Sequence, residues 1–234
     1  MKKWKTKNGY NIIQLLSGRS NVFLLSHNNT TILIDTSSKA NWNNLSRKLD
    51  SIGIVKIDYL ILTHTHHDHA ANAQKIRAKY KASVIVHKSE ADYLANGKAI
   101  LPKGTTFFTR IIGSLGKRIE HRFNYEPCPY DIKADSYLDL SMTGINAYLF
   151  HTPGHSIGSV SLIIDNEIAI VGDTLFGIFN DSIFPPYADN VNQLIDSWKG
   201  LLSTGCKIFL PSHGSSRDNT QLEREYNKRI RTEQ

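Results

Sequence analysis

The sequence predicts an α/β fold in which short buried strands alternate with amphipathic helices. Short apolar runs bounded by Gly, Pro, Asn or Asp recur along the chain, which is typical of strands. Between several of them, apolar residues repeat at helical spacing. The chain has 234 residues and 40% hydrophobic content, enough for a substantial core. We therefore expect residues 1–234 to form a single α/β domain.

The strands are predicted from runs rich in Val, Ile and Leu. They are residues 22–26, 31–35, 59–63, 82–87, 145–151, 159–165, 167–172 and 207–210. Asp165 and Asn166 separate two of these runs and favour a hairpin turn.

Four segments are predicted to be helices. Apolar residues at helical spacing run from Trp42 to Ile52 and end at Gly53, and a second such pattern covers residues 191–202. An Ala-rich stretch spans residues 70–80, and residues 219–231 favour a polar helix. We interpret the apolar faces as core.

Residues 88–138 do not follow this alternation. The segment contains helix-like stretches interrupted by prolines and glycines, among them Pro102, Gly113 and Pro127. Insertions this long are uncommon unless they form a lid or carry elements of their own. We predict a lid insertion over 88–138, with Tyr93, Phe107, Phe108 and Arg110 as the side chains that cap the site.

Charge and cysteine content narrow the function classes. The net charge is +7, but the Lys and Arg residues are scattered, so we expect a small-molecule substrate rather than nucleic acid. Cys128 and Cys206 are too few for a disulfide framework. No run of about 18 apolar residues exists to span a membrane, and residues 11–17 are too polar for a signal-peptide core. We expect a cytoplasmic protein.

The chemistry is concentrated in the segment from Thr63 to His69. It contains His64, His66, Asp68 and His69 directly after a predicted buried strand. Imidazole nitrogen and carboxylate oxygen together suit Zn²⁺, and Fe or Mn as well. This cluster therefore predicts a metal site.

Further ligand-type residues follow other predicted strands. His155 lies in a Thr-Pro-Gly-His turn, Asp173 in Gly-Asp-Thr and His213 in Pro-Ser-His-Gly. Because loops at strand ends commonly carry function, we expect these residues to meet the histidine cluster at one edge of a sheet.

The whole pattern resembles the metallo-β-lactamase-fold superfamily, and in particular its glyoxalase II-like hydrolases. The match consists of Asp35 at a strand end, His64-x-His66-x-Asp68-His69, and then His155, Asp173 and His213 in order. It covers roughly residues 20 to 215. The resemblance implies a four-layer αββα sandwich with the metals at one edge.

The resemblance also implies roles. His64, His66 and His155 would hold one metal, and Asp68, His69 and His213 a second. Asp173 would bridge both, and Asp35 would brace the histidine loop.

These roles predict a hydrolase with two metal ions, expected to be zinc. A shared metal-bound hydroxide would attack a small thioester, lactone or ester. Asp68 would be the catalytic residue that orients this hydroxide and collects its proton. Phe176, Phe179, Phe184 and Tyr187 either form an apolar wall beside the metals or belong to the core.

Two alternatives within the same superfamily remain. A persulfide dioxygenase would bind one iron through His64, His155 and Asp173. A nuclease would make use of the positive charge, although we see no additional nucleic-acid-binding arm.

Overall fold

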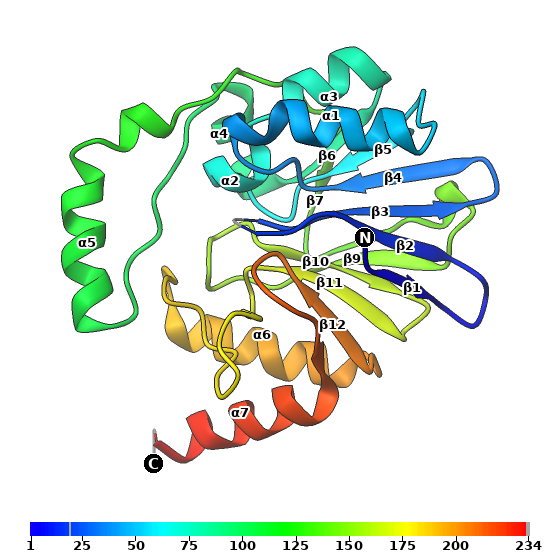
Figure 1. Ribbon diagram of the computed structural model, residues 1–234. Coiled ribbons are helices and arrows are strands. Elements are labelled where there is room, and N and C mark those ends of the chain that lie inside the picture. The colour runs from blue at the N-terminus through cyan, green and yellow to red at the C-terminus, as the bar shows by residue number, and fades with distance from the viewer. Residues whose placement is uncertain (19, 233–234) are drawn as a thin grey trace.

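Two β-sheets lie face to face at the centre of the molecule, and helices cover the outer face of each (Figure 1). The computed structural model describes residues 1–18 and 20–232. The predicted four-layer αββα sandwich is confirmed.

The first sheet is mixed. Its strands lie in chain order: β1 (Lys3–Lys5), β2 (Asn11–Leu16), β3 (Val22–His27), β4 (Thr30–Ile34), β5 (Tyr59–Ile61), β6 (Ser83–His87) and β7 (Ile132–Ala134). Strands β1 to β4 pair antiparallel, and β4 to β7 pair parallel. The parallel half sends the ends of β4 and β5 to the same edge.

The second sheet has the order β13 (Arg217–Asp218), β12 (Ile208–Pro211), β11 (Ile168–Gly172), β10 (Val160–Ile164), β9 (Ala147–His151) and β8 (Tyr137–Asp139). Strands β11 and β12 pair parallel, and the other neighbours pair antiparallel. The predicted hairpin joins β10 to β11, and Asp165 and Asn166 both have positive φ, at 56° and 52°. Such a pair matches the right-handed twist of the strands.

Helices α1 (Trp42–Ser51) and α3 (Ala73–Tyr80) cover the first sheet, and α6 (Val191–Ser203) and α7 (Asn219–Thr232) the second (Figure 1). The shorter elements are α2 (His67–Ala70), α4 (Ala91–Ala95) and the 3₁₀ turns η1 (Lys39–Asn41), η2 (Lys88–Glu90), η3 (Glu120–Phe123) and η4 (Ser141–Thr143). Helix α5 (Phe107–Lys117) stands outside the four layers (Figure 1).

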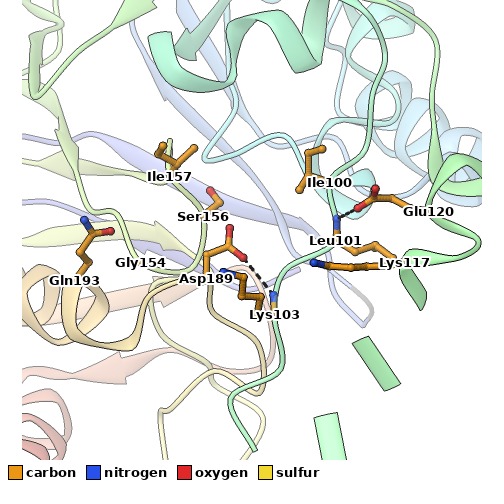
Figure 2. Close-up of a pocket in the computed structure, with 10 residues that line it drawn as sticks. All are labelled: Ile100, Leu101, Lys103, Lys117, Glu120, Gly154, Ser156, Ile157, Asp189 and Gln193. Carbon is orange, nitrogen blue, oxygen red and sulfur yellow. Dashed lines mark hydrogen bonds between the residues drawn. The ribbon is translucent and has the colours of Figure 1, made fainter. Parts of the chain in front are cut away.

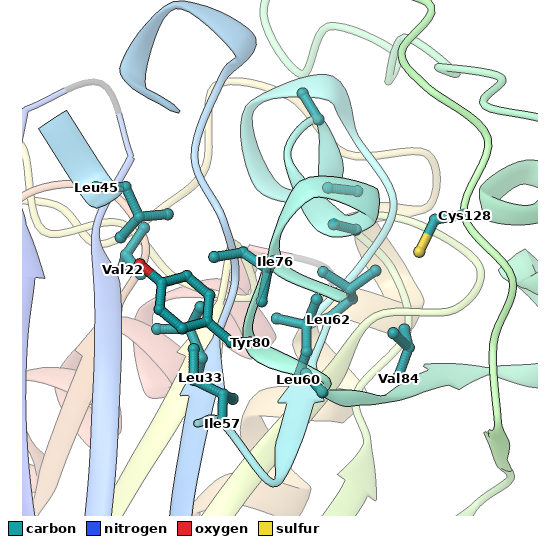
Figure 3. Close-up of a cluster of buried hydrophobic side chains, with 14 of the residues drawn as sticks. Val22, Leu33, Leu45, Ile57, Leu60, Leu62, Ile76, Tyr80, Val84 and Cys128 are labelled. Atoms are coloured by element: carbon teal, nitrogen blue, oxygen red, sulfur yellow. The ribbon is translucent and has the colours of Figure 1, made fainter. Parts of the chain in front are cut away.

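Side-chain alternation along the strands builds the layers. On β4, Leu33 packs in the cluster that contains Leu45 and Tyr80 of the covering helices, part of which Figure 3 shows. Its neighbours Ile32 and Ile34 point the other way and pack between the sheets. A third cluster, which includes Trp198 of α6, joins the second sheet to its helices.

Several elements differ from the predictions. The predicted helix over 70–80 is two helices, α2 and α3, and α2 begins inside the histidine cluster at His67. Strands β1, β2, β7, β8 and β13 were not predicted. The start of segment 88–138 packs into the sandwich through Ala91 and Leu94 of α4, and its end carries β7 of the first sheet and leads into β8 of the second. Its middle carries α5. Within the described residues, no helix has the length and apolar character needed to cross a membrane.

Candidate metal centre

All seven predicted ligand residues lie at one edge of the sandwich. Residues 64–69 follow β5, and Asp173 follows β11. His155 lies in the turn between β9 and β10, and His213 follows β12. The close approach of the His155 turn to α6 requires glycine at Gly154, since a Cβ there would lie 2.3 Å from the backbone nitrogen of Leu194.

Asp35 ties the loop of residues 63–69 to the loop that carries His213. It follows β4 with a φ of 61°, an uncommon conformation for a residue with a side chain. Its carboxylate accepts hydrogen bonds from the backbone N–H of Thr63 at 2.8 Å, from His69 Nδ1 at 2.9 Å and from Ser212 Oγ at 3.1 Å. Because Nδ1 of His69 is used in this way, its Nε2 faces the centre of the site.

The rings of His64 and His155 are oriented in the same manner. Thr63 donates its hydroxyl to Asp35, so its oxygen is left to accept from Nδ1 of His64 at 3.1 Å. Nδ1 of His155 donates to the carbonyl of Tyr187 at 2.9 Å. In both histidines Nε2 is left as the inward-facing atom.

The inward atoms form two groups that meet at Asp173. His66 Nδ1 and His155 Nε2 are 3.0 Å apart in one group. In the other, His213 Nε2 is 3.4 Å from Asp68 Oδ2. Asp173 Oδ2 is 3.5 Å from His155 Nε2 and 3.2 Å from His213 Nε2, so it reaches both groups.

Three overlapping sets have ligand atoms that all lie within 4.8 Å of one another. They are His64, His66 and His155; His64, His69 and Asp173; and Asp68, His69 and His213. The site therefore offers several neighbouring arrangements of three metal-ligand atoms.

Three of the inward-facing atoms are buried and have no hydrogen-bond partner among the described residues. They are His64 Nε2, His69 Nε2 and Asp173 Oδ1. Burial of an unpaired polar atom costs free energy, so such atoms converging on one point fit a bound cation. The nitrogen and oxygen donors suit a divalent metal such as zinc.

The histidine pKa values differ between the two groups of ligand-type residues. Burial and the neighbouring imidazoles hold the pKa values of His64 and His66 well below their usual range, so both rings are neutral ligands at pH 7. Burial also opposes the charged form of His213, but Asp173 and Asp68 outweigh it and raise its pKa to about 9. The same carboxylates raise the pKa of His69 well above its usual range against its burial. In that half of the site a metal would displace protons.

Two residues that the sequence analysis missed hold the histidine loop. The buried carboxylate of Glu90 accepts from the N–H of Thr65 at 2.6 Å, from the N–H of Gly158 at 2.9 Å, and from the hydroxyl of Ser156. Tyr125 donates its hydroxyl to the carbonyl of Thr65 at 2.9 Å. Both partners of Thr65 come from segment 88–138, so this segment fixes the backbone between His64 and His66. A buried contact of this kind leaves no periodic or motif signal in the sequence.

Other predicted residues divide between site and core. Phe176 stacks on His213 at 4.7 Å between ring centroids. Phe184 packs on Trp198, and Phe179 is 50% exposed. His87 is buried and stacks on His151 at 4.1 Å, outside the ligand sets.

The aromatic residues predicted to cap the site do not reach it. Phe107 and Phe108 are 81% and 71% exposed, and neither lines the cavity at the ligand residues. Ile112, Leu115 and Ile119, from the next turns of the same segment, line it instead.

Comparisons with known proteins agree with this geometry. The pattern of the metallo-beta-lactamase superfamily matches residues 17–218. A probable metallo-hydrolase of Methanocaldococcus jannaschii is 28% identical over 62% of this chain and 62% of its own length. A hydroxyacylglutathione hydrolase of Pelagibacter ubique is 26% identical over 60% of this chain and 46% of its own length. The chain thus spans about half to three fifths of these relatives.

The fold itself recurs in a solved structure. A metallo-beta-lactamase superfamily protein from Sulfolobus tokodaii superposes with a TM-score of 0.67 at 20% identity, over 94% of this chain and 86% of that one.

Proposed function

The chain belongs to the metallo-beta-lactamase superfamily, and from this premise we propose that it is a hydrolase with two divalent ions, expected to be zinc, that cleaves a small thioester, lactone or ester. The observation that carries the proposal is the position of Asp173, whose Oδ2 lies 3.5 Å from His155 Nε2 and 3.2 Å from His213 Nε2. A carboxylate in reach of two groups of histidines can be shared by two neighbouring ions.

We assign His64, His66 and His155 to one ion and Asp68, His69 and His213 to the other, with Asp173 shared. When bound, such ions lower the pKa of coordinated water toward ~7 and polarise the carbonyl oxygen of a substrate. The inward-facing nitrogens fixed by Asp35, Thr63 and the carbonyl of Tyr187 support this assignment.

Asp68 is the residue we assign to water. Its side chain is 23% exposed, against 5% for Asp173, and it lines the cavity from which a substrate enters. An ionised carboxylate there can orient a water molecule and accept a proton from it. In the overall reaction, the bond between the acyl carbon and the leaving sulfur or oxygen breaks. Water supplies OH to the acyl carbon and H to the leaving atom.

The relative named hydroxyacylglutathione hydrolase supports cleavage of an acyl group. Only 46% of its length is covered by this chain, so we do not assign glutathione as the carrier. We also propose a cytoplasmic location, which cell fractionation would test.

Metal analysis together with a substrate panel tests the function. Protein loaded with Zn, Fe or Mn is assayed on thioesters, lactones, β-lactams and phosphodiesters, and its metal content is measured by mass spectrometry. Two ions per chain with hydrolysis of acyl substrates would support the proposal. One iron per chain with oxygen consumption on a persulfide, or cleavage of phosphodiesters alone, would replace it with one of the two alternatives.

A further inference from the structure

One cavity, of about 570 Å³, opens directly onto the proposed ligands. Its size is in the range of small-molecule sites. Five of the seven ligand residues lie at one end of it: His66, Asp68, His155, Asp173 and His213. Any molecule that reacts at the metal centre must therefore enter this cavity.

Apart from His67 and Tyr187, the remaining residues of the wall are apolar or glycine. Ile112 and Leu115 of α5, with Leu101, Ile119 and Phe123 from its flanks, form one side, and Phe176 lies on the other. No Lys or Arg is among the described residues that line this cavity, and its carboxylates are those of Asp68 and Asp173. Beyond the proposed ligands, a charged substrate body would meet only His67 and Tyr187 as polar side chains among the described residues of the lining.

Helix α5 presents its apolar side chains without packing them into the core. Ile112 is 43% exposed, Leu115 57% and Ile119 40%, and α5 has no buried residue. Apolar surface of this kind is stabilised when another apolar group removes it from water. Because these side chains face a cavity that ends at the ligand residues, the group that covers them can belong to the substrate.

Three charged residues of segment 88–138, Lys103, Lys117 and Glu120, line a different cavity. Figure 2 shows these residues and Asp189 around a pocket of about 460 Å³. None of the proposed ligands is among the described residues that line it, although Gly154 and Ser156, on either side of His155, are. Leu101 lines both cavities. These charged side chains thus line a neighbouring cavity rather than the one that contains the proposed ligands.

We propose that the substrate carries an apolar acyl chain of several methylene groups, which lies against Ile112, Leu115 and Ile119 while its carbonyl lies among the ligand residues. This inference deepens the proposed hydrolase function and rests on it.

A series of thioesters of one carrier, N-acetylcysteamine, tests the inference with acetyl, butyryl, hexanoyl and octanoyl groups on the zinc-loaded protein. Each added methylene that is buried should raise kcat/KM about fourfold. Leu115→Ser should lower the octanoyl-to-acetyl ratio about tenfold. Phe107→Ser on the same helix is the matched control, because Phe107 does not line the cavity, and it should leave the ratio within about twofold.

The outcomes separate the inference from the function on which it rests. Hydrolysis with a flat or inverse dependence on chain length, or equal effects of the two variants, would overturn the inference and leave the hydrolase intact. If no acyl substrate were cleaved, calorimetry with non-reactive S-dodecyl and S-ethyl thioethers would decide the cavity separately. Tighter dodecyl binding that Leu115→Ser weakens would support it, and equal binding would overturn it.

Discussion

The edge of the sandwich that carries the seven proposed ligands, here called the ligand edge, and helix α5 line the same cavity but are built in opposite ways. At the ligand edge, polar side chains are buried, and Asp35 and Glu90 tie neighbouring loops with several hydrogen bonds each. Helix α5 has no buried residue and presents apolar side chains outside the sandwich (Figure 1). On the proposed function, the hydrogen bonds hold the proposed ligands in place, and the apolar side chains of α5 are left to contact the substrate.

The largest effect is expected at the residue that the two halves of the ligand edge share. Asp173→Ala should reduce turnover by about a thousandfold or more and lower metal content to one ion or fewer, because both groups of ligands lose an oxygen. Mass spectrometry and steady-state kinetics measure both. Asp181→Ala, an exposed carboxylate in the following loop, is the control. Full metal occupancy in Asp173→Ala would refute its bridging role.

The free energy of unfolding should depend strongly on side chains in the sandwich core and only weakly on those of α5. Leu60→Ala on β5 removes a fully buried side chain and should cost about 2–5 kcal/mol of unfolding free energy. Leu115→Ser on α5 should cost about 0.5 kcal/mol or less, because this side chain is 57% exposed. Urea denaturation of both variants measures the contrast, and a cost for Leu115→Ser near that of Leu60→Ala would show that α5 is part of the core.

A substitution at Glu90 tests whether segment 88–138 helps to hold the proposed ligands in place. Glu90→Gln replaces a carboxylate that accepts from Thr65 and Gly158 by an amide, which can accept through only one oxygen. Metal affinity should fall about 10–100-fold, as is typical when groups that orient ligands are lost. Zinc titration against a competing chelator measures it. Asp92→Asn, at an exposed position of α4, is the matched control and should leave the affinity unchanged, whereas equal effects of the two variants would argue against this role of Glu90.

The smallest effect concerns acid stability near the ligand edge. Burial and the stacked His151 lower the pKa of His87 to about 4, against about 6.5 in an unfolded chain. As the pH falls, the imidazole of His87 therefore takes up a proton in the unfolded chain before it does so in the folded chain. The free energy of unfolding that this residue contributes above pH 6.5 is lost as the pH falls toward 4. Between pH 7 and 5, His87→Leu should lose about 1 kcal/mol less than the native chain in urea denaturation. Equal losses would show that His87 is not held neutral.

The sequence indicated which polar residues come together at one edge of the sandwich, but not which residues line the cavity beside them. His64, His66, Asp68 and His69 lie within six positions after a buried strand, and Gly or Pro marks the turns at His155 and His213, so local patterns located them. Strand β2 was missed because Asn11 and Gln14 interrupt its apolar residues. Strands β7 and β8 have three residues each, too few to show a period.

The contacts of segment 88–138 are set by tertiary packing, which no local pattern records. In the sequence Glu90 is one acid in a polar stretch, yet it is buried against Thr65. On α5 the aromatic pair Phe107 and Phe108 was predicted to cap the site, but the helix turns Ile112 and Leu115 toward it. One helical turn decides which side chains line the cavity.

The most direct test of the central claim is a crystal structure of zinc-loaded protein with anomalous scattering measured at the zinc edge. Two anomalous peaks with the Asp173 carboxylate between them, one beside His64, His66 and His155 and the other beside Asp68, His69 and His213, are the predicted result. A single peak, or two peaks that Asp173 does not join, would contradict the account.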